Sequence, residues 1–563
     1  MAHDKQDGSR YIKMWEFMEN ANKNWDNLWQ ECADWSLPHK DNITNVRIAG
    51  QEKPPQRLTD TCIEANFNFA SGMYSYMFPP STVWAKFKHP VPDVMDEEGV
   101  ADYFENTSRM IHETILESNF AQEVQESLLD MGAFGTNNIY AEEDDGDVVR
   151  LRSFSVADFR IKTNNKGRVD TVGRKLKLDA RQMMQEFGED ALREAGLSEI
   201  KEYLKVGSGG EDKYEVVHLV MPRTDYDPEK ITNDNKPWAS RYICLRTKKI
   251  IKESGYDYNP YFVGRFAIGN DEEYGRSPMM MILATARRTN SIYRSMLVSA
   301  EQAANPQWLL PDDDSVSFKG SPNRAGALVY YRATGGANAK PERLPANGDP
   351  NVAFEMYQFH ESSIKRAFFN HLFRPLEDYR NMTATETNAR MSTDLMALAP
   401  FVNRYQDEVV TPLLTYIYYL LEKQGKLPEM PQALLDDPNF EIEYVGKISL
   451  ATKSFEVMGA FQTMQMFGEA AQYMPEAASA LNSVDVPKLL RETWYANGAS
   501  MNALKPKAQV EEEAEADRLA AEKQQQVDNL PQMAQAYSQG IKAPEDGSMS
   551  QAAGEALAGQ MGG

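Results

Sequence analysis

The sequence is poor in cysteine. Only Cys32, Cys62 and Cys244 occur among 563 residues, and they form no closely spaced pair. This scarcity argues against a disulfide framework or a cysteine-based zinc site and favours a reducing compartment. The chain also lacks an apolar run of about 18 residues, so no membrane-spanning helix and no membrane partner is expected. The polar start, MAHDKQDGSR, has no apolar segment typical of a signal peptide.

Sequence signatures of catalysis are missing as well. A phosphate-binding loop needs G-x-x-x-x-G-K-[ST], but the Gly-Lys pairs at 446–447 and 425–426 are followed by Ile and Leu. His112 and His360 begin an H-E-x-x-H zinc pattern that no second histidine completes, and no G-x-S-x-G elbow occurs. The acidic run 312–314 is explained as a solvated loop. We therefore predict no catalytic residue, no metal and no cofactor.

Positive charge is scarce too, with 60 Lys and Arg against 83 Asp and Glu, a net charge of −23. An acidic surface of this size argues against a protein that grips nucleic acid over a broad face, but it is compatible with one past which nucleic acid slides. The hydrophobic content of 42% suffices for a core and for subunit interfaces. The length predicts several domains or one large elaborated body.

Hydrophobic periodicity predicts helices first and strands next. Apolar residues at helical spacing indicate three helical regions, at 9–36, 57–77 and 98–131. Alternation with turn signals from 136 to 178 then predicts a meander of short strands. A short helix and three more strands follow, at 179–193, 214–222, 241–247 and 261–266. The segment 205–213 (KVGSGGEDK) is expected to be a loop.

The pattern then returns to helix. A helix is predicted over about 277–304, with Ser277 as N-cap and Pro278 at the first helical position. Residues 307–350 form a compact insert with one clear strand, GALVYYRAT. Another helix is predicted at 351–376, with Met356, Phe359, Ser363 and Ala367 on one line.

A polar stretch, NMTATETN (381–388), separates this helix from the longest apolar stripe in the chain, which runs from Met391 to Leu420. Pro400 and Pro412 fall inside the stripe, so the helix should be kinked or broken there. A strand at 440–449, helices over about 452–503 and a poorly ordered polar tail complete the prediction. The fold class is α+β, mainly helical.

Three stretches carry a resemblance to a known family. They are RLTDTCIEANFNFASGMYSYMFPPSTVWAKFK (57–88), EYGRSPMMMILATARRTN (273–290) and NMTATETNARMSTDLMALAPFVNRYQDEVVTPLL (381–414). In sequence, order and spacing the chain resembles, from about residue 9 to 500, the portal or head-to-tail connector proteins of short-tailed (podovirus-type) bacteriophages. The tail after residue 508 carries no diagnostic motif.

The resemblance implies a ring of about twelve copies, a dodecamer, around a central channel. The parts it implies are a wing (1–270), a first stem helix (271–306), a clip (307–350), a second stem helix (351–380), a tunnel loop (381–390), a long kinked helix with a wing strand (391–451), a crown (452–507) and an acidic, Gln-rich tail (508–563).

The function implied by the resemblance is a non-enzymatic portal at one capsid vertex, through which double-stranded DNA is packaged and ejected. Implied partners are the terminase large subunit, a tail adaptor, and scaffolding or capsid proteins. The implied location is the virion, and the host cytoplasm during assembly. Two alternatives stay open: another virion structural protein, such as a tail tube or capsid component, and an enzyme with a cryptic site.

Basic residues on the two stem candidates are the predicted DNA-channel residues. The segment 276–304 carries four arginines against one acid, Glu301. A ring would stack such residues into belts facing DNA, which carries one negative charge per roughly 1.7 Å of axis. The alternative is that they pair with acids of a neighbouring subunit. The candidates are Arg287, Arg288, Arg294, Lys365 and Arg366.

The tunnel loop is the second predicted site. Uncharged Thr and Asn side chains can hydrogen-bond to phosphate without a strong fixed attraction. The alternative is a plain helix start, because Thr383 and Glu386 have the spacing of a capping box. The predicted loop residues are Asn381, Thr383, Thr385, Thr387 and Asn388.

Overall fold

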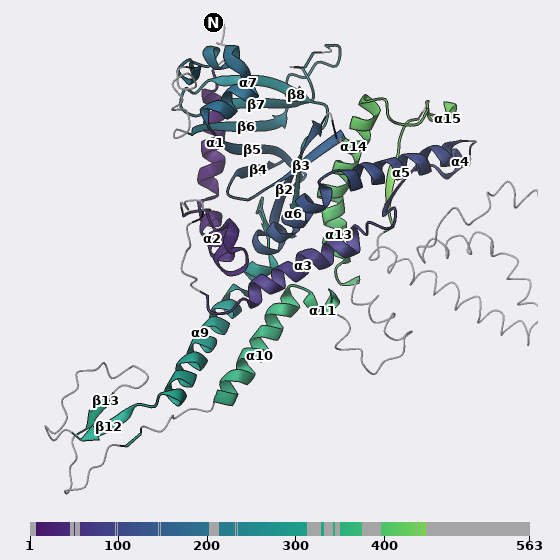
Figure 1. The fold of residues 1–563 in the computed structure, drawn as a ribbon. Coiled ribbons are helices and arrows are strands. Elements are labelled where there is room, and N and C mark those ends of the chain that lie inside the picture. Colours follow the sequence, from purple (N-terminus) through teal and green to yellow (C-terminus); the bar gives the residue numbers. More distant parts are fainter. Residues whose placement is uncertain are drawn as a thin grey trace, which may run out of the picture. The chain divides into compact units, whose positions relative to one another are not determined.

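The computed structural model describes residues 7–445, with gaps at 46–49, 51–56, 96, 98, 145, 147, 202–212, 231, 234, 312–327, 332–341, 344–349, 374–395 and 436 (Figure 1). The chain divides into two compact units, Met1–Phe455 and Glu456–Gly563. All described residues belong to the first unit. The predicted loop 205–213 (apart from Lys213), the tunnel loop, the crown helices and the tail lie outside the described residues.

The N-terminal helices are α1 (Ser9–Ala21), α2 (Lys23–Ser36) and α3 (Thr61–Met77), with a short 3-10 turn at Pro38–Lys40. The single helix predicted over 9–36 is therefore wrong at Asn22, where ψ is 4° and the helix breaks. The Asn22 amide donates to the Met18 carbonyl oxygen and to the Tyr274 hydroxyl, both at 2.9 Å. The break lets α1 and α2 pack against different partners.

The helical region predicted over 98–131 is two helices, α5 (Val100–Glu117) and α6 (Phe120–Phe134), preceded by the short α4 (Pro92–Met95). Helix α6 ends at Gly135, which is left-handed with φ 75°. A side chain is excluded there, because an added Cβ would lie 2.5 Å from the backbone nitrogen of Ser277. Gly135 thus lets the end of α6 cross the chain just before α9 at close range.

The predicted strands form two antiparallel sheets. The smaller has the order β3-β2-β9, from β2 (Thr136–Asp144), β3 (Val148–Phe154) and β9 (Tyr261–Arg265). The larger has the order β4-β5-β6-β7-β8, from β4 (Phe159–Thr163), β5 (Val169–Leu178), β6 (Tyr214–Pro222), β7 (Trp238–Cys244) and β8 (Ile250–Tyr256). Strands are present across 136–178 as predicted, but the single meander is wrong: β2 pairs with β3 in the smaller sheet and β4 with β5 in the larger one. Strand β8 was not predicted.

Helices cover both faces of the larger sheet. On one face, Trp15 and Met18 of α1 pack against Val217 and Leu219 of β6. On the other, α7 (Ala180–Glu194) packs against alternate residues such as Val216. The alternation of adjacent β6 residues between the two clusters follows from the two-residue period of a strand.

The predicted break in the long apolar stripe is confirmed. The segment consists of α13 (Ala399–Tyr405), a π-helix (Gln406–Val410) and α14 (Thr411–Lys423), with Pro400 and Pro412 in the first turns of α13 and α14. After α15 (Gln432–Leu435), β15 (Glu441–Tyr444) pairs antiparallel with β1 (Ala85–Lys88). Buried residues of the N-terminal helices, of the smaller sheet and of α13 and α14 share one hydrophobic core, so the described part of the chain is an α+β unit.

Two helices lead away from this core, α9 (Pro278–Ala304) and α10 (Pro350–Ala367), and we call them the α9–α10 hairpin (Figure 1). A two-stranded ribbon of β10 (Ala267–Ile268) and β11 (Gly275–Arg276) precedes it. Between the helices, β12 (Trp308–Pro311), β13 (Leu328–Tyr331) and β14 (Glu342–Arg343) form a sheet of order β13-β12-β14. The predicted insert thus contains strands.

The second helix is shorter than predicted. It stops at Ala367 rather than at 376, and a turn with Phe369 at φ 58° leads into α11 (Asn370–Phe373). The turn returns the chain to α3, where the Phe373 ring occupies the space that a side chain at Gly72 would need. The sequence gives no sign of this turn, because a positive φ at phenylalanine is favoured by packing and not by local propensity.

Candidate functional site

The start of α9 is fixed by local sequence and by a long-range contact. Ser277 caps the helix, since its side chain accepts from the Met280 amide at 3.0 Å, and Pro278 lies in the first turn. The same hydroxyl donates to the Ala133 carbonyl oxygen of α6 at 2.9 Å. Ser277 is fully buried, so one side chain both begins the helix and anchors it to α6. The predicted N-cap is confirmed.

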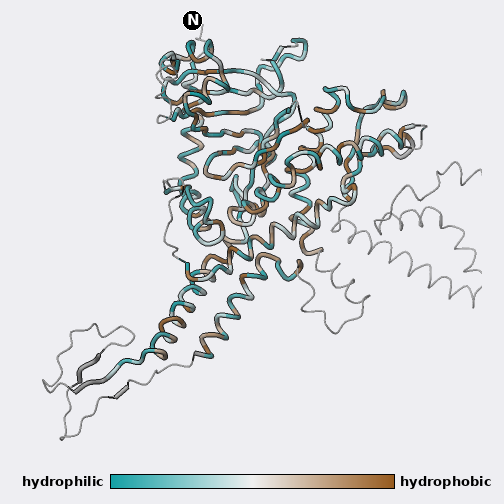
Figure 2. The backbone as a smooth tube through the Cα atoms, in the orientation of Figure 1, coloured by the Kyte–Doolittle hydropathy of each residue, from teal (hydrophilic) through white to brown (hydrophobic). Residues whose placement is uncertain are grey.

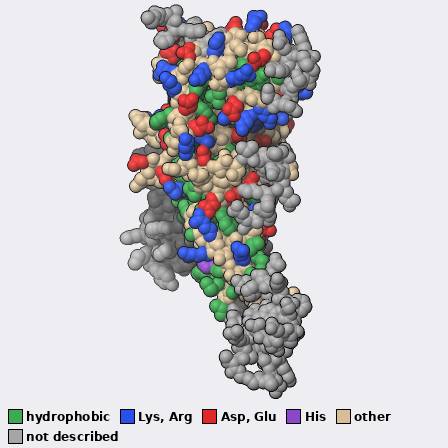
Figure 3. Space-filling model, turned by 90° about the vertical axis from the view of Figure 1, so that its left-hand side faces the viewer, with side chains coloured by type: hydrophobic (Ala, Val, Ile, Leu, Met, Phe, Trp, Pro, Cys, Tyr) green, Lys and Arg blue, Asp and Glu red, His purple; other side chains and the backbone are tan. Residues whose placement is uncertain are grey.

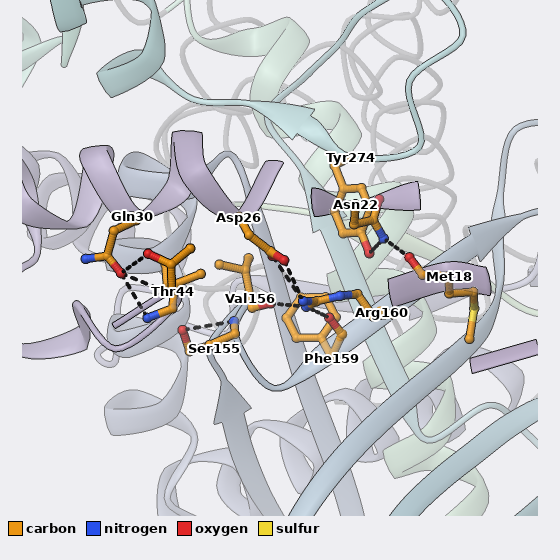
Figure 4. Close-up of polar contacts among 12 residues, drawn as sticks. Met18, Asn22, Asp26, Gln30, Thr44, Ser155, Val156, Phe159, Arg160 and Tyr274 are labelled. Atoms are coloured by element: carbon orange, nitrogen blue, oxygen red, sulfur yellow. Dashed lines mark hydrogen bonds and ion pairs between the residues drawn. The ribbon is translucent and has the colours of Figure 1, made fainter. Parts of the chain in front are cut away.

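Tyr274, three residues before this cap, joins the hairpin to the N-terminal helices. Its hydroxyl accepts from the Asn22 side chain and from the Ile161 amide of β4, at 2.9 and 3.0 Å (Figure 4). Its ring packs edge-on against Trp29 of α2, with 5.0 Å between ring centroids. Burial raises the pKa of the Tyr274 phenol well above its usual value, so the group stays neutral.

A buried ion pair reinforces the same region. The Arg160 guanidinium of β4 donates to Asp26 of α2 at 3.0 Å and to the carbonyl oxygens of Val156 and Phe159 (Figure 4). Burial raises the pKa of the Asp26 carboxyl, while Arg160 lowers it. Because Arg160 has several acceptors, its charge is compensated despite its burial.

The base half of the α9–α10 hairpin packs into the main core, whereas further out the two helices contact each other. Near the base, Ile282 and Leu283 of α9 and Ile364 of α10 belong to the main core. Further out, the helices contact each other through Tyr293 and Tyr357, whose ring centroids lie 5.6 Å apart. Hydrophobic segments continue along both helices (Figure 2).

The predicted channel residues all lie on this hairpin. Arg287 is exposed, but it donates to both carboxylate oxygens of Glu31 in α2, at 2.6 and 2.5 Å. Lys365 is half-buried and donates to Glu361 one turn away at 2.8 Å. Both charges are therefore partly neutralised within the same chain.

The other three candidates are exposed: Arg288, Arg294 and Arg366. Within the part of the chain that the structure describes, none of the three forms an ion pair. Figure 3 shows basic side chains next to hydrophobic ones on one face of the hairpin. The second predicted site, with Asn381, Thr383, Thr385, Thr387 and Asn388, lies outside the described residues.

Two features of the hairpin were not predicted. Glu31 is the partner of Arg287, but 256 residues separate them and nothing in the sequence links them. Met356 and Phe359 were placed on one line of a helix, but they are exposed, 49% and 69%, together with Val352. The apolar line was visible in the sequence. Its exposure was not, because periodicity does not tell a core-facing stripe from an interface stripe.

Among the described residues, no group of His, Cys, Asp and Glu could hold a metal ion, and no helix is long and apolar enough to cross a membrane. All three cysteines are free and buried. Burial raises the pKa of the Cys62 thiol to about 12, which disfavours the reactive thiolate.

Comparisons with known proteins place the chain. A family model described as bacteriophage head to tail connecting protein matches residues 9–504. The portal protein of Salmonella phage epsilon15 is 27% identical over 542 residues, covering 95% of this chain and 94% of the relative. The probable portal protein of Bordetella phage BPP-1 is 25% identical over 472 residues, covering 83% of each chain. Since the family model spans most of the sequence, this chain belongs to the bacteriophage head to tail connecting protein family.

Proposed function

We propose that this chain is a phage portal protein that assembles into a ring of about twelve copies at one capsid vertex. Double-stranded DNA would pass through the ring during packaging and ejection. The chain would have no enzymatic activity. ATP hydrolysis would belong to the terminase large subunit, which a tail adaptor would later replace, and scaffolding or capsid proteins would contact the ring during assembly in the host cytoplasm.

The observation that carries the proposal is the α9–α10 hairpin. The chain also belongs to a family described as bacteriophage head to tail connecting protein. The hairpin leads away from the core and bears exposed arginines, and the chain segment that connects its two helices contains a small sheet. These features support α9 and α10 as stem helices and the insert 307–350 as a clip. The wing would comprise residues 1–270 with the long kinked helix and strand at 391–451. Residues 452–507 would form the crown.

Arg288, Arg294 and Arg366 are the best channel candidates, because their charge is not neutralised by another described residue. The acidic remainder of the molecule would limit retention of the DNA, since the net charge is −23. The alternative function is a tail tube or capsid component without a DNA conduit.

Electron microscopy of the purified full-length chain tests the proposal. We expect rings with a central hole and near twelvefold symmetry. Compact particles without a hole would overturn it and favour another virion component. ATP or nucleic-acid turnover by the pure chain, abolished by a point substitution, would favour a cryptic enzyme.

The tunnel loop is tested separately. Deleting 381–388 should leave rings intact but impair packaging or retention of DNA in an infection assay. Normal packaging by the deletion variant would remove the proposed role of this loop.

A further inference from the structure

An apolar stripe runs along the outer side of α10. Val352, Met356 and Phe359 are spaced by four and three residues, which places them on one side of a helix, and they are 55%, 49% and 69% exposed. Tyr357, which contacts Tyr293, marks the side of α10 that packs on α9. At about 100° per residue, Phe359 lies well away from that side. A stripe of large exposed apolar residues is typical of an interface.

The outer side of α9 differs from it. Tyr293 marks the side that faces α10. At the same 100° per residue, Ser291 and Val298 lie on the opposite side, and both are exposed. Small side chains such as Ser291 leave room on α9 for large side chains of a partner.

The outer side of α10 and the outer side of α9 carry apolar and oppositely charged residues at matching positions along the hairpin. The helices are antiparallel and the Tyr293–Tyr357 contact sets their register. Counting in opposite directions from this contact places Phe359 at the same height along the hairpin as Ser291. It places Glu355 of α10 opposite position 295 of α9, one residue from Arg294. Both are exposed, and neither forms an ion pair with another residue of the described chain. Within one hairpin they point to different sides, so they cannot meet each other.

We propose that the outer side of α10 binds the outer side of α9 in a second copy of this chain. Phe359 and Met356 of one copy would pack near Ser291 and Val298 of the next, and Glu355 would pair with the next copy's Arg294. Because the two surfaces are different, the contact is head-to-tail, and such a contact generates a ring when its rotation closes.

We call this contact between α10 of one copy and α9 of the next the seam. The seam rests on the proposed function, because only a chain that assembles with copies of itself would form it. It also changes the role of one candidate residue. Arg294 belongs to the subunit interface, whereas Arg288 and Arg366 remain the DNA-channel candidates. A packed interface pair of this kind sets the register between copies more than it adds affinity.

Charge reversal tests the pair in the full-length protein. Glu355→Arg and Arg294→Glu, made singly, should each raise the protein concentration needed for ring assembly by roughly tenfold, measured by mass photometry or sedimentation. The double variant, Glu355→Arg with Arg294→Glu, should restore assembly. Arg193→Glu on the exposed surface of α7 is the matched control and should assemble as the wild type does.

Each result has a distinct meaning. If wild-type protein forms no rings, the proposed function fails. If it forms rings and both single variants assemble equally well, the seam fails while the function stands. If Arg294→Glu assembles normally but loses DNA packaging, Arg294 is a channel residue and the seam is again overturned. A thermal unfolding midpoint equal to that of the wild type shows that each variant is folded.

Discussion

Arg265 of β9 and Glu408 of the π-helix form a largely buried ion pair. The Arg265 side chain is 4% exposed and reaches Glu408 of the π-helix at 2.6 Å, while the Arg265 backbone amide donates to the same carboxylate at 2.9 Å. The guanidinium also donates to the Gly167 carbonyl oxygen at 2.8 Å. One arginine thus links β9, the β4–β5 turn and the π-helix.

Removing the carboxylate should be costly, because it leaves a buried guanidinium without its counter-charge. We predict that Glu408→Ala lowers the free energy of unfolding by about 3 kcal/mol, measured by urea denaturation. The matched control is Glu189→Ala, which breaks the exposed pair with Lys201 and should cost less than about 1 kcal/mol. Equal losses in the two variants would contradict the assignment of a buried, structural pair.

His218 gives the larger sheet a dependence on pH. Its ring is fully buried, with Nδ1 2.7 Å from the Tyr261 hydroxyl and Nε2 2.9 Å from the Ser240 hydroxyl. Burial, followed by Arg174 and Lys252, lowers the pKa of the imidazole well below its usual value. The folded chain therefore keeps His218 neutral at pH values where the unfolded chain protonates it, which is below about 6.5.

Stability contributed by neutral His218 is present above pH 6.5 and is lost as the pH falls. As the pH falls from 6 to 5.5, the free energy of unfolding should decrease with a slope that approaches about 1.4 kcal/mol per pH unit. This range lies above the sequence pI of about 4.9, so the measurement avoids the pH at which the chain has no net charge. His218→Gln should remove this slope in urea unfolding. Asp130, whose pKa burial raises to about 6, contributes the opposite sign between about pH 4 and 6. Because both curves contain it, their difference isolates His218, and parallel curves would refute the prediction.

At the level of elements, the cap of α9 is a short-range signal with a long-range consequence. Ser277→Ala removes the cap and also leaves the Ala133 carbonyl oxygen without this donor. We predict a loss of about 1–2 kcal/mol in the free energy of unfolding. Ser295→Ala, on the exposed side of the same helix, is the control and should change stability by less than about 0.5 kcal/mol. A similar effect of both substitutions would show that the cap is not special.

Elements with local signals could be predicted from the sequence. The start of α9 follows from Ser277-Pro278, and the breaks at Pro400 and Pro412 follow from the missing proline amide. Helix breaks that depend on distant residues could not be predicted from the sequence. Asn22 is bonded to Tyr274, 252 residues away, so the N-terminal helix looked continuous. Strand β8 was missed because IIKESGY lacks a clear apolar alternation.

The candidate site also divides into features that the local sequence predicts and features that depend on distant residues. The sequence placed the basic residues on two helices, and both helices exist. It could not show that Arg287 is held by Glu31, or on which side of the hairpin Arg294 lies, because both depend on how α9 packs.

For the whole molecule, the net charge bears on the proposed passage of DNA. With −23 per copy, each copy repels the phosphate backbone as a whole, and the basic residues of the hairpin oppose this locally. We predict that the purified protein binds linear double-stranded DNA weakly at about 0.15 M salt, with a Kd above about 1 μM by fluorescence anisotropy. Lowering the salt should strengthen binding only modestly, because few phosphates are neutralised. Tight, strongly salt-dependent binding would contradict a channel that lets DNA slide.

The pairing of β1 with β15 has a consequence for synthesis. Roughly 350 residues separate the strands, so at about 5–20 residues per second β1 leaves the ribosome some 20–70 s before its partner. During that time Phe87 and an open strand edge face other nascent chains. Lys86 and Lys88 flank Phe87, and lysine on an unpaired edge discourages pairing with foreign strands. Lys88 then comes within 3.6 Å of Glu443 once β15 arrives. The two lysines therefore discourage wrong pairing of the unfinished fold, and Lys88 also pairs with Glu443 in the finished one.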